Sequence, residues 1–159
     1  LDLILTQDST SWKGEYFTAV EARRSPGCVQ VPRVPFLLAA NGPRAMRLAA
    51  RYGRGWVTTG RSSEDEASWW RSLRDLAGRF DDALDAVGRP RTSVDRYLQA
   101  DAGPTFSLSS VEHFRDVLGR AAELGYTDVI THWPRQDGPY TGLESTVEQV
   151  ADEVLPQLG

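Results

Sequence analysis

Short apolar runs alternate with amphipathic stretches along the chain from Phe36 onward. A short apolar run bounded by glycine or proline is typical of a strand buried in a parallel sheet. A longer stretch with apolar residues three and four positions apart is typical of a helix packed on one face. Strand and helix alternate four times, which predicts an α/β fold with a parallel sheet and right-handed crossovers.

The four strands are expected at residues 36–40, at 55–59, within 91–100 and at 127–133. The first is apolar throughout, so we expect it to be buried on both faces. Gly42 follows it in a tight turn and can adopt a backbone geometry that other residues avoid.

The helices are expected from Pro43 to about Tyr52, from about Ser63 to Gly88, from Ser109 or Ser110 to Gly125, and from Ser145 or Thr146 through Leu155. Pro43 suits the first position of a helix. Ser63 and Glu66 have the spacing of a capping box. Trp69 and Trp70 are expected to pack in the core rather than to form a stacking platform.

The first 35 residues have a different character, with several turn residues and few long apolar runs. Leu1 to Gln7 is expected to be the end of a helix, with a strand as the alternative. Lys13 to Phe17 suits a small hairpin or an extended loop. The remainder up to Pro35 is rich in proline and glycine, which favours irregular structure.

The composition narrows the class of protein. The chain has 159 residues, 40% of them hydrophobic and 25% charged, which is enough for one domain with a core. Cys28 is the single cysteine, which fits a reducing cytoplasm, and neither it nor the two histidines have metal-ligand spacing. A net charge of -4 and short apolar runs argue against nucleic-acid and membrane partners.

Candidate chemistry gathers where the expected strands end, because ligands of parallel α/β folds bind there. The helix that begins at Pro43 offers free N–H groups to an anion, and Arg44 lies in its first turn. Thr58, Thr59 and Gly60 end the second strand. The alternative is an ordinary strand–helix turn that binds nothing.

The end of the fourth strand is the second candidate region. His132 can exchange a proton near neutral pH, Trp133 can wall a pocket, and Arg135 can pair with a phosphate or carboxylate. The alternatives are a structural histidine bonded to nearby backbone, a tryptophan packed on the last helix and a solvated loop arginine.

The segment from Pro35 to Pro43, followed by Leu48 to Trp56, resembles the mid-chain signature of luciferase-like flavin- or deazaflavin-dependent oxidoreductases. Gly125 to Ile130 resembles the approach to the last strand of that family. The resemblance implies a TIM barrel, of which residues 36–159 form four βα units (strands five to eight) and residues 1–35 an insertion, all within one domain. It also implies two binding sites. The cofactor site comprises Ala39, Ala40, Asn41, Gly42, Pro43 and Arg44. The substrate or anion site comprises Thr58, Thr59, Gly60, Arg61, Trp133 and Arg135.

The implied activity is oxidation or monooxygenation of a small organic substrate with the deazaflavin coenzyme F-420 or with FMN. The first four strands of the barrel are missing from the chain, so we expect a C-terminal half-barrel, either a fragment or a natural truncation. The alternatives are an inactive scaffold, a half that pairs with a separate N-terminal half, a homo-oligomer, and a flavodoxin-like open sheet. His132 is the one catalytic candidate.

Overall fold

The computed structural model describes residues 1–158, which divide into two compact units, Leu1–Phe36 and Leu37 onward. The first unit begins with helix α1 (Asp2–Thr6). Strands β1 (Ser9–Lys13) and β2 (Thr18–Arg23) then pair antiparallel. The turn between them is closed by a hydrogen bond from Gly14 N to Phe17 O. The expected helix and hairpin are therefore both present.

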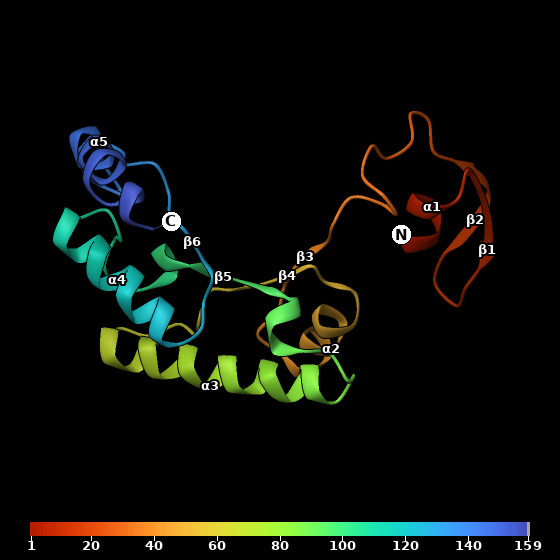
Figure 1. Cartoon of the computed structure of the whole chain (residues 1–159), viewed down its shortest axis with the longest axis horizontal. Coiled ribbons are helices and arrows are strands. Elements are labelled where there is room, and N and C mark those ends of the chain that lie inside the picture. Colours follow the sequence, from red (N-terminus) through yellow and green to blue (C-terminus); the bar gives the residue numbers. More distant parts are fainter. Residues whose placement is uncertain (159) are drawn as a thin grey trace. The chain divides into compact units, whose positions relative to one another are not determined.

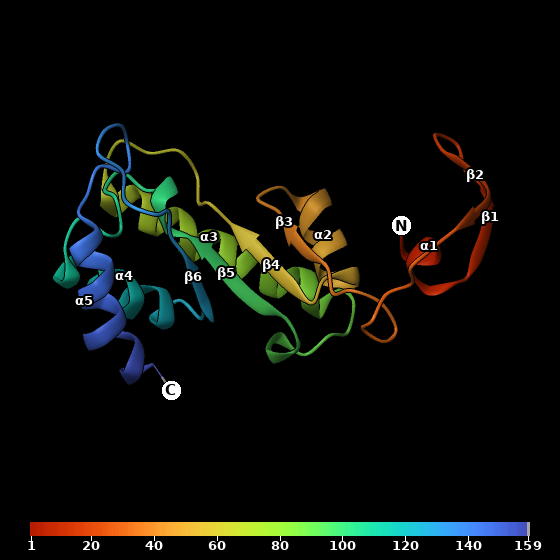
Figure 2. The same cartoon turned by 90° about the horizontal axis from the view of Figure 1, so that it is seen from above.

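The second unit contains a four-stranded parallel sheet with the order β3-β4-β5-β6 (Figures 1 and 2). Its strands are β3 (Leu37–Ala39), β4 (Gly55–Thr58), β5 (Asp95–Gln99) and β6 (Asp128–Ile130). Its helices are α2 (Pro43–Tyr52), α3 (Glu66–Asp85), α4 (Val111–Glu123) and α5 (Glu144–Glu153). Short 3-10 turns lie at Arg91–Ser93, Ala100–Ala102 and Leu155–Gln157.

Helices α2, α3 and α4 cover one face of this sheet (Figure 1). The core between them is centred on Trp56 of β4, whose ring stacks on Phe80 of α3 at a centroid distance of 4.4 Å. The indole of Trp56 also donates to Ala40 O at 2.7 Å. Trp69 and Trp70 are both buried, which confirms that the pair packs in the core.

The opposite face of the sheet is open within the second unit, and Figure 2 looks onto it. The prediction that the first strand is buried on both faces is wrong, because Leu37 of β3 is 52% exposed. Ile130 of β6 is also exposed. Alternate residues of β3 and β6, at the two edges of the sheet, therefore point away from the helices and are not covered by this unit.

Three local expectations need correction. Gly42 has an ordinary φ of −101°, and a Cβ placed on it would meet no atom within 4 Å, so nothing in the fold requires glycine there. Helix α3 is capped by Asp65, which accepts from Ser68 N at 2.7 Å, and not by Ser63. The fourth strand ends at Ile130, and the residues after it make side-chain contacts instead of continuing the sheet.

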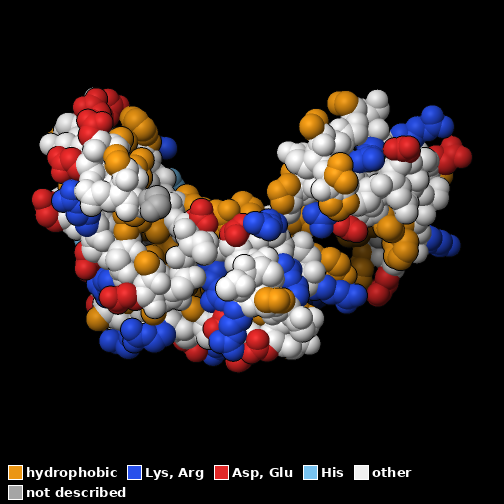
Figure 3. Space-filling view, in the orientation of Figure 1, with side chains coloured by type: hydrophobic (Ala, Val, Ile, Leu, Met, Phe, Trp, Pro, Cys, Tyr) orange, Lys and Arg blue, Asp and Glu red, His pale blue; other side chains and the backbone are white. Residues whose placement is uncertain are grey.

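Charged side chains of both signs are intermixed over the helical surface of the second unit (Figure 3). Arg44 and Arg47 of α2 are exposed, as expected for one side of an amphipathic helix. Within residues 1–158, no helix combines the length and the apolar character needed to span a bilayer.

Candidate active site

All four strands of the sheet run parallel, so their carboxyl ends lie along one edge. The residues that follow these ends are Ala40 after β3, Thr59 after β4, Ala100 after β5 and Thr131 after β6. Two hydrogen-bonded clusters form along this edge, one joining β3 to β4 and the other joining β5 to β6.

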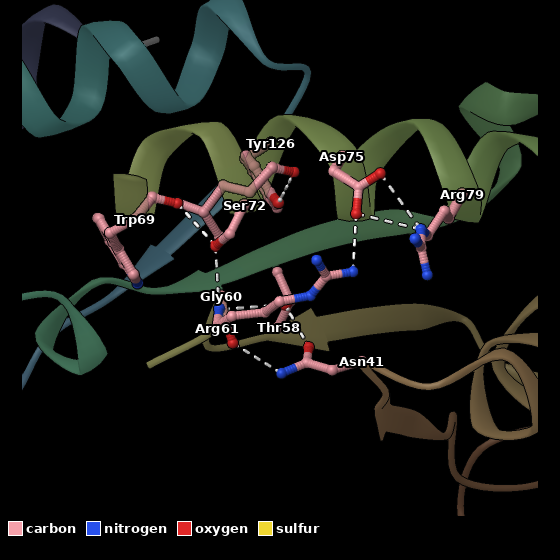
Figure 4. Close-up of polar contacts among 10 residues, drawn as sticks. Asn41, Thr58, Gly60, Arg61, Trp69, Ser72, Asp75, Arg79 and Tyr126 are labelled. Carbon is pink, nitrogen blue, oxygen red and sulfur yellow. Dashed lines mark hydrogen bonds and ion pairs between the residues drawn. The ribbon is translucent and has the colours of Figure 1, made fainter. Parts of the chain in front are cut away.

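The first cluster is built around Asn41 (Figure 4). Its Oδ1 accepts from the buried Thr58 hydroxyl at 2.5 Å, and its Nδ2 donates to Gly60 O at 2.8 Å and to Thr59 Oγ1 at 3.1 Å. Trp69 of α3 donates to Thr59 O at 3.0 Å. The Asn41 amide therefore links the two strand ends and has both its oxygen and its nitrogen engaged.

Arg61 leaves this cluster and points along α3 (Figure 4). Its backbone N–H donates to Ser72 Oγ at 3.0 Å, and its guanidinium lies 2.8 Å from Asp75 Oδ2. Asp75 also pairs with Arg79. The structure thus brings Thr58, Thr59 and Gly60 beside Asn41 but directs the Arg61 side chain away from them.

Helix α2 begins immediately after the first cluster. Gly42 is its N-cap and provides no side chain to accept from the first turn. Pro43 has no N–H, and Met46 N bonds to Gly42 O, which leaves the N–H groups of Arg44 and Ala45 in the first turn. Open space around Gly42, these donors and the exposed Arg44 together suit a phosphate or carboxylate.

The second cluster is built around Asp101, whose side chain has no exposed area. Its Oδ1 accepts from Ser107 N at 3.0 Å and from Ser107 Oγ at 2.5 Å. Its Oδ2 accepts from Thr131 Oγ1 at 3.0 Å and from His132 N, and it lies 3.0 Å from His132 Nδ1. One carboxylate therefore joins the end of β5, the loop before α4 and the end of β6.

Burial alone would raise the pKa of the Asp101 carboxyl, because desolvation disfavours the charged form. The hydrogen bonds from the Ser107 hydroxyl, the His132 and Ser107 backbone N–H groups and the His132 ring outweigh burial and lower that pKa below its ordinary value. Asp101 is accordingly ionised at neutral pH.

His132 is held on a second side by Tyr140, whose ring stacks on the imidazole at a centroid distance of 3.9 Å and an angle of 8°. The His132 side chain is 39% exposed. Trp133 donates from Nε1 to Glu144 at 3.2 Å, at the start of α5. Arg135 bonds through its backbone to Tyr140 O, and its side chain is exposed.

The sequence pointed to His132 but not to the residues that hold it. Asp101 follows β5 by two positions and so lies at the same edge, a placement that could have singled it out. Ser107 and Tyr140 lie in loops, and no local pattern indicates that they reach this carboxylate and this ring. Within residues 1–158, no group of three or more potential ligand side chains is arranged to hold a metal ion.

A parallel α/β sheet with polar clusters at its strand ends defines a protein class in which ligands bind at that edge. The model of the luciferase-like monooxygenase family matches residues 1–102, which is well over half of the chain. The chain belongs to this family.

Among characterised relatives, the chain is similar to the F420-dependent glucose-6-phosphate dehydrogenase of Microbacterium testaceum (strain StLB037). The two are 30% identical over 92 residues, which is 58% of this chain and 25% of the relative. Two solved structures share the fold. They are the coenzyme F420-dependent tetrahydromethanopterin reductase of Methanopyrus kandleri (TM-score 0.75, 12% identity) and an F420-dependent secondary alcohol dehydrogenase (TM-score 0.72, 14% identity).

Each structural match covers 99% of this chain but only 60% and 58% of the two larger proteins. The expected α/β class with a parallel sheet is confirmed, as is the luciferase-like family. The assignment of β3 to β6 as barrel strands five to eight, the single-domain arrangement, the cytoplasmic location and the individual site residues stay predictions.

Proposed function

We propose that the chain carries part of an oxidoreductase site, located at the carboxyl ends of β3 to β6. The site uses the deazaflavin coenzyme F-420 on a small organic substrate. The observation that supports this most is the strand-end edge itself. It has an open helix N-terminus after β3, and after β5 and β6 it has a buried Asp101 carboxylate paired with the partly exposed His132. The F420-dependent relatives favour this cofactor over FMN, and hydride transfer over monooxygenation.

In this proposal the first turn of α2 and Arg44 hold the phosphate side of the cofactor. Neutral backbone donors and one arginine are a suitable donor set for a phosphodiester. Asn41 keeps the turns after β3 and β4 at a fixed separation, with Ala39 and Ala40 leading into the turn. The deazaflavin, when bound, supplies the hydride acceptor, and the protein binds and orients it.

The substrate side of the site is assigned to Thr59, Trp133 and Arg135, which are exposed at or near the same edge. Arg61 is a weaker candidate because Asp75 already neutralises it. Arg135 would bind an anionic group of the substrate, and the Trp133 ring would exclude water from one side.

Titration of the full chain with coenzyme F-420, followed by fluorescence polarisation, tests the proposal, with FMN as the comparison. We expect saturable binding of F-420 and weaker binding of FMN. Tighter binding of FMN would favour a flavin-dependent monooxygenase instead. If the chain bound neither cofactor, the proposal would be contradicted.

The variant Gly42→Asp tests whether the first turn of α2 binds the phosphate of the cofactor. An aspartate at the N-cap should stabilise α2 by about 0.5 kcal/mol relative to glycine, since it accepts from the free N–H groups and suits the helix dipole. The same carboxylate should weaken F-420 binding by occupying those donors. Gly78→Asp adds the same charge at an exposed position of α3 and should leave binding unchanged. If Gly42→Asp raises stability but leaves affinity unchanged, the phosphate lies elsewhere.

The open face of the sheet favours a second candidate, a half-barrel that acts only when paired or as a scaffold. Exposed Leu37 and Ile130 lie on the two edge strands, and unpaired edges invite association. Light scattering at several concentrations tests this. A homo-oligomer would support self-pairing, whereas a monomer that binds no cofactor would favour a scaffold or a missing partner half.

A further inference from the structure

The open face of the four-stranded sheet carries apolar side chains on every strand. Leu37 of β3 and Ile130 of β6 are exposed on it, and Val57 of β4 lies beside Tyr97 of β5 in the register of the sheet. A Cβ placed on Gly55 would lie 2.4 Å from Leu37 and 2.6 Å from Tyr97, so these two side chains close over that glycine on the same face. Parallel sheets are normally covered on both faces, so this face needs a cover.

The two edges of the sheet are equally unfinished. Strand β3 pairs only with β4, and β6 pairs only with β5, which leaves unpaired backbone groups along both outer strands. The two edge strands are the same length, three residues each, and run in the same direction. A closed barrel of parallel strands with helices outside typically has about eight strands. Two copies of this sheet supply that number.

The helices that follow the edge strands have opposite charge. Helix α2, after β3, contains three arginines and no acidic residue, whereas α5, after β6, contains four acidic residues and no lysine or arginine. The acidic residues are Glu144, Glu148, Asp152 and Glu153. Of these, Glu153 pairs with Arg115 of α4. Within residues 1–158, neither Glu148 and Asp152 nor Arg44 and Arg51 have an ion-pair partner.

The side of α2 that faces away from α3 is also partly apolar. Pro43 and Arg47 line a groove against α3, and Leu48 and Tyr52 lie on the opposite side of the helix, 46% and 42% exposed. The guanidinium of Arg51 lies 5.2 Å from the centre of the Tyr52 ring. This flank of α2 therefore offers two apolar side chains and a cation to a neighbouring helix.

We propose that a second copy of this chain covers the open face, with β6 of each copy beside β3 of the other, so that two second units close one eight-stranded barrel. Twofold symmetry then places the acidic α5 of each copy against the basic α2 of the other, at two equivalent joints. The charge and the strand length of each edge match the other edge of the same chain, and this favours a second copy over an unrelated partner.

The closed pair would also complete the candidate site. All eight strands would end at one rim, so the first turn of α2 in one copy would lie next to the loop after β6, with Trp133 and Arg135, of the other. The inference specifies the paired half-barrel considered above as the second candidate function. It does not rest on binding of F-420, and its test uses no cofactor, so either proposal can fail without the other.

The first test is the mass of the full chain in solution, measured by light scattering after gel filtration over a range of concentrations. We expect twice the 17.6 kDa of one chain. A monomer at every concentration would overturn the proposal. Assemblies that grow beyond two copies with concentration would also overturn it, because a closed pair has no free edge to extend.

Charge reversal tests the two joints. Arg44→Glu with Arg51→Glu makes α2 acidic, and Glu148→Lys with Asp152→Lys makes α5 basic. Each double variant alone places like charges at both joints and should raise the dissociation constant of the dimer by about 100-fold or more. An equimolar mixture of the two variants pairs opposite charges at both joints and should recover the dimer mass.

Arg71→Glu with Arg74→Glu is the matched control, because it makes the same change of charge on exposed positions of α3, which lies between the two edges. It should leave the dissociation constant unchanged, and far-ultraviolet circular dichroism should show that all the variants keep their helices. A dimer that neither joint variant weakens, or two weakened variants that do not recover when mixed, would show that the copies associate through another surface and would overturn the proposal.

Discussion

The Asn41 cross-link between the ends of β3 and β4 gives the sharpest stability prediction. Asn41→Ala removes three hydrogen bonds, one from the Thr58 hydroxyl and two to Gly60 O and Thr59 Oγ1. A typical bond contributes about 1 kcal/mol net, but Asn41 and Thr59 are exposed and regain bonds to water. The buried Thr58 hydroxyl loses its acceptor, so we expect a total cost of about 2 kcal/mol.

Urea unfolding of the full chain, followed by tryptophan fluorescence, measures this cost. Trp56, Trp69 and Trp70 are buried in the second unit and should report its unfolding. For a chain of this size the expected loss corresponds to a fall in Tm of about 4 to 8 °C. Thr58→Ser keeps the hydroxyl and the contact to Asn41, so it is the matched control and should cost less than Asn41→Ala.

A double-mutant cycle isolates the contact between the two side chains. Thr58→Val removes the hydroxyl at nearly constant volume, and the double variant should be more stable than the sum of the two losses by about 1 kcal/mol. An Asn41→Ala cost below about 0.5 kcal/mol, or additivity within about 0.3 kcal/mol, would refute the cross-link as the element that fixes these two turns.

Three further predictions concern other parts of the second unit. Asp101, with its lowered pKa, stabilises the fold above the pKa of the unfolded chain and loses this contribution as pH falls through the folded pKa. In urea unfolding at pH 7, Asp101→Asn should lower the free energy of unfolding by about 2 kcal/mol relative to wild type. This difference should become smaller at pH 3, and a difference that does not change with pH would contradict the argument. Arg89→Met should lower the free energy of unfolding by about 2 kcal/mol in the same assay, because the guanidinium donates to three backbone carbonyls between α2 and the turn before β5. A decrease of less than half this amount would show that water replaces the guanidinium as donor. Gly60→Ala should lower the free energy of unfolding by about 2 to 3 kcal/mol, since φ is +70° and the new Cβ would lie 2.5 Å from Trp69 Nε1. Gly119→Ala in α4 is the control and should stabilise the fold by about 0.5 to 1 kcal/mol. Equal Tm shifts for the two variants would refute the strain argument.

The helix boundaries show how far local signals reach. Pro43 and Gly53 delimit α2 as expected, and Ser110, one of two expected caps, accepts from His113 N at 3.1 Å. Asp65 caps α3 instead of Ser63, although both are good N-cap residues. The choice between two such candidates depends on where the chain leaves β4, which the local sequence does not contain.

The burial of the strands shows where local signals fail. The apolar run from Phe36 to Ala40 reads the same whether one face or two faces are covered. In the structure the helices cover one face, and Leu37 on the other is half exposed. A hydrophobic pattern indicates that a segment is apolar enough to be buried. The packing of other segments against it determines which of its faces are actually covered.

The sequence by itself determined the order of strands and helices, the parallel sheet and the two regions at its edge where polar residues follow a strand. These features depend on residue periodicity, on glycine and proline, and on the rule that parallel strands end together. Only the tertiary structure decided which of those polar residues act together. Asp101 reaches across from β5 to His132 after β6, 31 positions later, and Arg61 turns away to Asp75, because contacts between side chains on different elements are set by packing and not by neighbours in the chain.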